Sequence, residues 1–202
     1  GYASGVTQLG TSVSFVLNQD SSGVQVVIDG GASTLNLGAL AKGTHSVNLP
    51  SAGSSYQIKV RSAETVGWTQ FSSDSLTQSK YYSPRGVTVD TNPKRSTFGQ
   101  IIVAEAVGGA VAAGGRTTTD GLYIMSADQG DITGQGNTAY AGNVDWTTGG
   151  NASPWKISMN RADPLGQDYT IYISDWSDGH SGIWTADLRN PSASFSELLD
   201  NA

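Results

Sequence analysis

The sequence predicts an all-β protein, and three observations support that prediction. In the first third of the chain apolar and polar residues alternate along short segments, the pattern of strands with one buried face. Only 14% of the 202 residues are charged and 37% are hydrophobic, with Gly, Ser and Thr making up much of the difference. From residue 83 onward, short strand-like segments recur as an internal repeat.

The first strand series lies in residues 11–62. Alternating segments at 13–17, 24–28, 35–40, 47–49 and 56–60 are separated by turn signals such as Asp29-Gly30-Gly31. Closely spaced short strands of this kind are typical of a β-sandwich. We therefore place a sandwich at residues 1–75, a linker at 76–82 and a second region at 83–202.

Part of the first series resembles a known family. Segments 37–40, 43–47 and 53–60 are similar to Ig-like modules of the flagellar hook-cap type, in which a Gly-x-His-x-Val strand precedes a Gly…Tyr-x-Ile/Val-x-Val strand. The resemblance implies an Ig-like β-sandwich that acts as a spacer or scaffold rather than a catalyst. It also implies that His45 lies on a strand as a structural residue.

The second region contains two copies of one unit, at 83–152 and 153–202. Segment 83–89 matches 153–159, and 101–105 matches 171–175, both at an offset of 70 residues. Segment 121–123 matches 182–184 at an offset of 61, so an insertion of nine residues is expected within 107–119, as a surface loop. Short strands with acidic turns at fixed places resemble the antiparallel blades of degenerate β-propellers in bacterial surface proteins. Two such copies would not close a ring alone.

Equivalent positions of the two copies are expected to share a buried environment. The predicted core of the repeat region is Val87, Val89, Ile101, Val103, Leu122 and Tyr123 in the first copy, with Ile157, Met159, Ile171, Ile173, Ile183 and Trp184 in the second.

Charge and cysteine content exclude several functions. The formal net charge of −6 falls wholly in residues 83–202, because residues 1–82 hold four basic and four acidic side chains. An acidic surface repels phosphate backbones, which disfavours nucleic acid as a partner. The chain has no cysteine, so disulfides and thiol catalysis are excluded. No apolar run reaches the ~20 residues of a membrane span.

Several carboxylates cluster in the repeat region and raise the question of catalysis. They are Asp120, Asp128, Asp131 and Asp145 in the first copy, with Asp175, Asp178 and Asp187 in the second. Paired carboxylates serve in glycoside hydrolysis, but Asp also forms turns by bonding to its own backbone. Segment 175–181 contains Asp, His and Ser without a Gly-x-Ser-x-Gly elbow. We favour the turn interpretation and predict no catalytic residues.

Two binding chemistries stay open. Asp128, Asp131 and Asn137 offer oxygen ligands that suit Ca²⁺, although their spacing does not match an EF-hand; no other cofactor is indicated. Aromatic rings can stack on sugar faces, and the candidates are Trp155, Trp146, Tyr140 and Trp176. Trp155 is favoured among them, because its counterpart in the first copy is Arg85.

These features predict a non-catalytic structural or interaction module of an extracellular, secreted or cell-surface protein from a bacterium. An unclosed array of blades exposes strand edges, so we expect self-association into a multimer or fibre. The last residues, 195–202, resemble the start of a further repeat, which suggests that the chain is part of a longer one. The alternative is a carbohydrate-binding module or a fragment of a carbohydrate-active enzyme.

Overall fold

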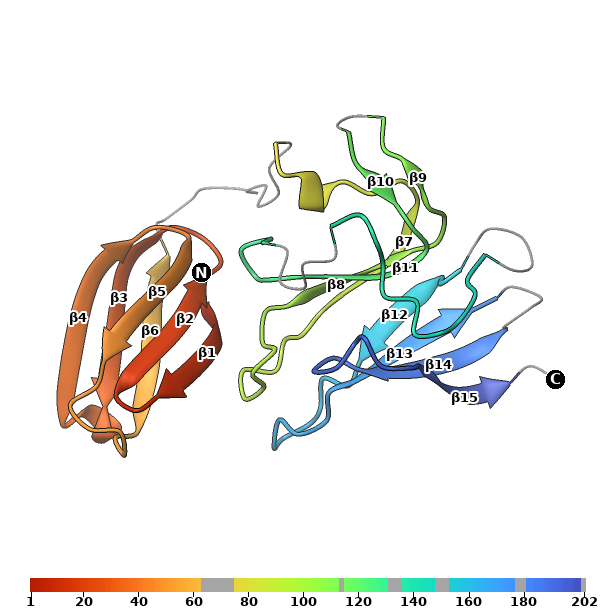
Figure 1. The fold of residues 1–202 in the computed structure, drawn as a ribbon. Coiled ribbons are helices and arrows are strands. Elements are labelled where there is room, and N and C mark those ends of the chain that lie inside the picture. The colour runs from red at the N-terminus through yellow and green to blue at the C-terminus, as the bar shows by residue number, and fades with distance from the viewer. Residues whose placement is uncertain (63–74, 113–114, 131–135, 148–152, 177–180, 201–202) are drawn as a thin grey trace. The chain divides into compact units, whose positions relative to one another are not determined.

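The computed structural model confirms that the protein is all-β. It describes residues 1–62, 75–112, 115–130, 136–147, 153–176 and 181–200. The chain forms two compact units, Gly1–Phe71 and Ser72–Ala202, each built from antiparallel sheets (Figure 1). None of the helical segments in the described ranges is long and apolar enough to cross a membrane.

The first unit contains two three-stranded sheets. Strands β1 (Ala3–Leu9), β2 (Ser12–Leu17) and β5 (Gly43–Asn48) form one sheet in the order β1-β2-β5. Strands β3 (Ser21–Ile28), β4 (Ser33–Leu40) and β6 (Tyr56–Ser62) form the other in the order β4-β3-β6. The predicted strands are all present. Strand β1 was missed because its sequence, ASGVTQL, lacks regular apolar alternation.

Alternate residues of both sheets meet in the core of this unit. Val13 of β2 packs with Val26 and Ile28 of β3, and Phe15 and Leu17 of β2 pack with Val24 of β3. The two sheets therefore lie face to face, as the period of two predicts. His45 lies on β5, with its ring 5.8 Å from the ring of Phe15.

The second unit contains a three-stranded and a four-stranded sheet that follow the internal repeat. Strands β7 (Pro84–Val89), β8 (Ile101–Glu105) and β11 (Gly121–Met125) form the sheet β11-β8-β7. Strands β12 (Lys156–Met159), β13 (Thr170–Asp175), β14 (Gly182–Asp187) and β15 (Ser196–Asp200) form the meander β12-β13-β14-β15. A short 3₁₀ turn, η2 (Thr77–Ser79), precedes them, and β9 (Gly109–Ala110) pairs with β10 (Thr117–Thr118).

The strand register of the two copies agrees with the offsets of 70 and 61 residues. In the first copy Val103 lies opposite Val87 on one side and Tyr123 on the other. In the second copy the counterpart of Val103, Ile173, lies opposite Ile157 and Trp184 in the same way. The first copy also has a partial equivalent of β15, since an isolated antiparallel bridge joins Leu122 of β11 to Tyr140.

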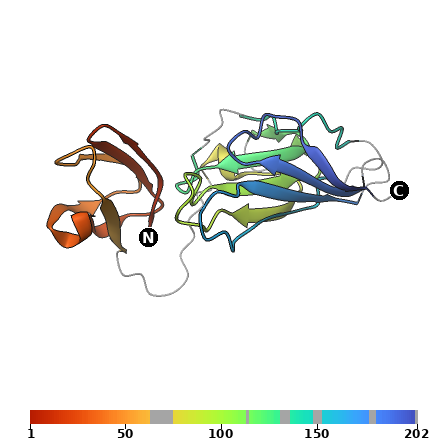
Figure 2. The ribbon, with the colours of Figure 1, turned by 90° about the horizontal axis from the view of Figure 1, so that it is seen from below.

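The two copies pack through opposite faces, which contradicts the expectation of a shared environment. Ile102 and Ala104 of the first copy lie in the cluster between the sheets, together with Ile171 and Ile173 of the second. Val103, the counterpart of Ile173, lies on the other side of its own sheet, in a separate cluster with Tyr123, Met125, Tyr81, Ile101 and Ala139. One face of copy one therefore covers the opposite face of copy two. Figure 2 shows the two sheets as stacked layers.

This arrangement corrects part of the predicted core. Val87 is 66% exposed and lies opposite Val103, on the side of its sheet that faces away from the second copy. Val89, Ile101, Ile183 and Trp184 are half-buried. The remaining predicted positions are buried: Val103, Leu122, Tyr123, Ile157, Met159, Ile171 and Ile173. Val103 and Tyr123 are buried in the separate cluster on the far side of the first sheet, whereas Leu122 is buried between the two sheets.

The predicted linker and the predicted surface loop are held together by a buried arginine. Arg116, in the insertion, is 3% exposed and donates hydrogen bonds to the carbonyl oxygens of Thr77, Gln78 and Lys80 at 3.3, 2.8 and 2.9 Å. Its guanidinium also lies 4.9 Å from the ring centroid of Tyr81. Residues 76–82 are thus part of the second unit rather than a linker, because Arg116 bonds three of their carbonyl groups to the first repeat copy.

A second buried arginine joins the two copies. Arg95 lies 3.1 Å from Asp90 in the first copy, and it donates to the carbonyl oxygen of Asn160 in the second at 2.7 Å. Asn92 adds a bond of 2.7 Å to the carbonyl oxygen of Asp163. The polar loops that follow β7 and β12 therefore contact each other, and the Arg95–Asp90 pair is shielded from water.

The packing predicts a contrast between two substitutions. Ile171→Ala removes a side chain that is 0% exposed between the sheets, and it should lower the free energy of unfolding by about 2–5 kcal/mol. Val87→Ala, on the exposed side of β7, should change that free energy by less than about 0.5 kcal/mol. Urea unfolding followed by tryptophan fluorescence measures both; equal costs would contradict the face assignment.

Candidate functional site

Two of the four predicted aromatic residues lie together on the second unit. The ring centroids of Trp155 and Trp176 are 5.2 Å apart, with the planes tilted by 37°. Trp155 precedes β12 and its backbone nitrogen donates to the carbonyl oxygen of Ser174 at 2.9 Å, while Trp176 directly follows β13. Trp176 is 65% exposed, which is unusual for so large an apolar ring.

Two basic side chains border this pair. The guanidinium carbon of Arg85 lies 5.0 Å from the ring centroid of Trp155, and the Lys156 Nζ lies 5.8 Å from it. The Lys156 Nζ also donates to the carbonyl oxygen of Arg85 at 2.9 Å, which joins β12 to β7. Neither cation forms a salt bridge within the described residues. We call Arg85, Trp155, Lys156 and Trp176 the aromatic platform.

The other two aromatic candidates lie elsewhere. Trp146 is 2% exposed and packs between the sheets, with its ring 6.1 Å from that of Trp184 and 6.2 Å from that of Phe195. The prediction that Trp146 contacts a sugar is therefore wrong, because a buried ring cannot stack on a ligand. Tyr140 is half-buried and packs against the same apolar cluster.

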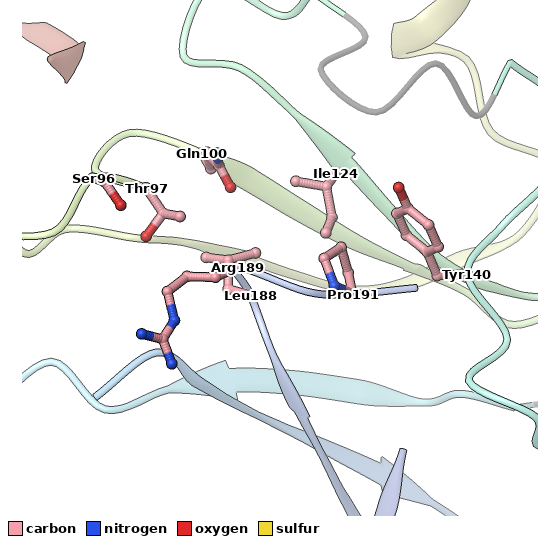
Figure 3. Close-up of a pocket in the computed structure, with 8 residues that line it drawn as sticks. All are labelled: Ser96, Thr97, Gln100, Ile124, Tyr140, Leu188, Arg189 and Pro191. Atoms are coloured by element: carbon pink, nitrogen blue, oxygen red, sulfur yellow. The ribbon is translucent and has the colours of Figure 1, made fainter. Parts of the chain in front are cut away.

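Tyr140 also lines a pocket of about 470 Å³ that opens between the two copies. Figure 3 shows Ser96, Thr97 and Gln100 on one side of it, and Leu188 and Arg189 from the turn after β14 on another. The charge of Arg189 is compensated, since its Nε donates to the carboxylate of Asp187 at 3.0 Å. The pocket therefore has a polar rim but no uncompensated charge from this arginine.

The predicted Ca²⁺ ligands do not form a described site. Asp128 accepts hydrogen bonds from the Ser126 hydroxyl and, at 3.3 Å, from the backbone nitrogen of Gly130. Asn137 is exposed, and its carbonyl oxygen accepts a bond from the hydroxyl of Tyr123 at 2.5 Å. Asp131 lies outside the described residues. Within them, no group of three or more His, Cys, Asp or Glu side chains comes together to hold a metal ion.

The remaining carboxylates act in turns and strand ends. Asp145 accepts from the backbone nitrogen of Thr147 at 3.1 Å, and Asp187 accepts from that of Arg189 at 2.9 Å. Asp175 accepts from the hydroxyl of Ser153, and Asp120 accepts from the backbone nitrogen of Gly108. Asp145 and Asp187 thus stabilise local turns, as the turn interpretation predicts, whereas Asp120 and Asp175 bond to residues 12 and 22 positions away in the sequence. Asp178 lies outside the described residues.

Glu105 is a titratable residue whose role the sequence did not reveal. It is fully buried at the end of β8 and accepts a hydrogen bond from the backbone nitrogen of Ser83. Asp175 occupies the same position in the second copy, so the acidic residue after the apolar strand ties down each Ser-Pro start. Burial raises the pKa of the Glu105 carboxyl, and the nearby Asp120 raises it further.

The raised pKa of Glu105 predicts how stability depends on pH. A carboxyl whose folded pKa exceeds its unfolded pKa stabilises the fold below the unfolded pKa, and that stabilisation is lost as the pH rises through the folded pKa. Glu105→Gln, which stays neutral, should therefore gain stability relative to the native chain as the pH rises from about 4 to 8. Urea titrations at each pH measure the difference.

Asp187→Asn is the matched control with the opposite sign. Hydrogen bonds from Arg189 lower the pKa of the Asp187 carboxyl, so its contribution is present above the unfolded pKa and is lost as the pH falls. Parallel pH profiles for the two variants would show that the burial of Glu105 does not control its titration.

Comparison with known proteins does not assign the site. No family model, no curated protein sequence and no solved structure matches this chain significantly.

Proposed function

We propose that this chain is a non-catalytic interaction module of an extracellular or cell-surface protein, and that its second unit associates with a second copy of the chain. The observation that carries the proposal is the way in which the two repeat copies within one chain stack on each other. The outward face of the β12–β15 sheet corresponds, position by position, to the face that the first copy buries. Tyr172 is the counterpart of Ile102, and Ile183 is the counterpart of Leu122.

Strand alternation defines this outward face. Ile171, Ile173 and Trp184 point toward the first copy, so Tyr172, Ser174, Ile183 and Thr185 point away from it. Leu199, which is 57% exposed, lies opposite Ile183 and extends the apolar surface onto β15. We call Tyr172, Ile183 and Leu199 the outward apolar face.

Charge supports a second copy as the occupant of this face. The chain carries a net charge of −6, so most approaches between two copies are repulsive. The cross-strand neighbours of Tyr172 and Ile183 on this face are serine and threonine, with Lys156 opposite Ser174; Asp187, at one end, is compensated by Arg189, and Asp200 follows Leu199 at the other. A two-fold contact places the same surface on both partners, so the apolar side chains of this face meet each other.

The strand edge itself is a poorer contact than the face. Leu198 is the extra residue of a bulge in the β14–β15 ladder, with Glu197 before it and Asp200 two residues after it. Bulges and charges are the features with which natural sheets prevent pairing at an edge. The packing of faces is therefore favoured over continuation of the sheet, and it predicts closed dimers before fibres.

Ile183→Lys tests the self-association. Light scattering of the native chain should show a mass that rises with concentration, and salt should favour the dimer by screening the acidic surfaces. Ile183→Lys should remain monomeric, because two lysines would meet at the two-fold axis. Leu165→Lys, at a position that is 68% exposed and outside the face, is the control and should associate as the native chain does. A native chain that stays monomeric throughout would exclude the proposal.

Carbohydrate binding is a second candidate function, and the aromatic platform is the observation that favours it. An exposed Trp176 beside Trp155 offers the flat apolar surface on which the C–H faces of sugars stack. The fragment of a carbohydrate-active enzyme is less supported, because Asp120, Asp145, Asp175 and Asp187 each accept a hydrogen bond from a backbone nitrogen or a hydroxyl group of the fold.

A further inference from the structure

We infer that the aromatic platform binds a polysaccharide in which acidic and neutral sugars alternate. The inference rests on carbohydrate binding as the second candidate function, and it specifies the charge of the ligand. It depends on the two cations of the platform, Arg85 and Lys156, whose charges are not compensated by any described carboxylate.

The four side chains form one surface. Trp155 contacts Trp176 on the one hand and the guanidinium of Arg85 on the other, with centroid distances of 5.2 and 5.0 Å. Trp176, Arg85 and Lys156 are exposed, and Trp155 is half-buried beneath them. A sugar stacked on Trp176 therefore has cationic donors beside it, across the Trp155 ring.

The donors of both cations remain available to a ligand. Lys156 uses one of its three N–H groups on the carbonyl oxygen of Arg85, which fixes its position beside Trp155. The guanidinium of Arg85 lies over the Trp155 ring, which orients it, and among the described residues its N–H groups bond to no carboxylate. A carboxylate on a sugar ring matches this geometry, since Arg can bond both of its oxygens.

The surrounding charge favours a ligand with well-separated acidic groups. Residues 83–202 carry the whole net charge of −6, so two cations form a small positive area on an acidic unit. A dense polyanion such as nucleic acid would extend beyond that area and meet repulsion. A chain with one carboxylate for every two sugars places its neutral rings on the tryptophans and a single charge on the cations.

Hyaluronan, in which uronate and neutral sugars alternate, is a suitable probe. Its carboxyl-reduced form is the matched neutral polymer, and a single-stranded oligonucleotide is the dense polyanion. Titration calorimetry is done at a protein concentration at which light scattering shows a monomer, so that self-association does not affect the result. We expect binding to hyaluronan that weakens with added salt, and at least about tenfold weaker binding to the other two probes.

Variants separate the stacking from the charge. Trp176→Ala and the double variant Arg85→Gln/Lys156→Gln should each weaken binding to hyaluronan by about tenfold or more. The double variant Lys59→Gln/Arg61→Gln removes two exposed cations from the first unit and should bind as the native chain does. All of these variant positions are exposed, and circular dichroism checks that the β-fold is retained.

Each outcome decides between the two claims. Equal binding of hyaluronan and its reduced form, lost only in Trp176→Ala, would overturn the acidic ligand and leave carbohydrate binding intact. Binding to neither polymer, or binding that Trp176→Ala does not change, would overturn both. Preference for the oligonucleotide would assign the platform to nucleic acid instead.

Discussion

The apolar contact between the two sheets of the second unit is the interaction on which the rest of that unit depends. Each copy alone is a small antiparallel sheet, and such a sheet needs a partner over its apolar face to be stable. Ile102 and Ala104 supply one side of the contact and Ile171 and Ile173 the other. Because one face of the first copy meets the opposite face of the second, the contact is not symmetric.

That asymmetry explains which aromatic residues are available. Trp146 and Phe195 fill the space between the sheets, so the Trp146 ring is buried and cannot contact a ligand. Trp155 precedes β12 and Trp176 follows β13. Strand β12 lies beside β7, and this places Arg85 of β7 against Trp155. Gly86 permits this approach, since a Cβ there would lie 3.1 Å from the backbone nitrogen of Ile157.

The buried polar groups fix the relative position of the copies. Arg95 bonds to one carboxylate of its own copy and to the backbone of the other, and Arg116 gathers the carbonyl groups of residues 77–80 over the first sheet. An apolar interface tolerates sliding, whereas directional hydrogen bonds in a dry interior do not.

The sequence by itself determined the all-β class, the strands from residue 12 to residue 62 and the duplication, because alternation and spacing are local properties of the chain. The offsets of 70 and 61 residues also agree with the strand register, which is equivalent in the two copies. The turn role of the carboxylates followed from the residue type alone, as Asp145 and Asp187 illustrate.

Only the tertiary structure decided which face of each copy is buried. A strand pattern identifies two faces, but it does not say which of them a neighbouring sheet will cover; for this reason Val87 is exposed while its counterpart Ile157 is buried. The same choice buried Trp146 and left Trp176 in solvent. It also placed Arg85 beside Trp155, two residues that the repeat had aligned as equivalents but that the stacking of the copies made neighbours.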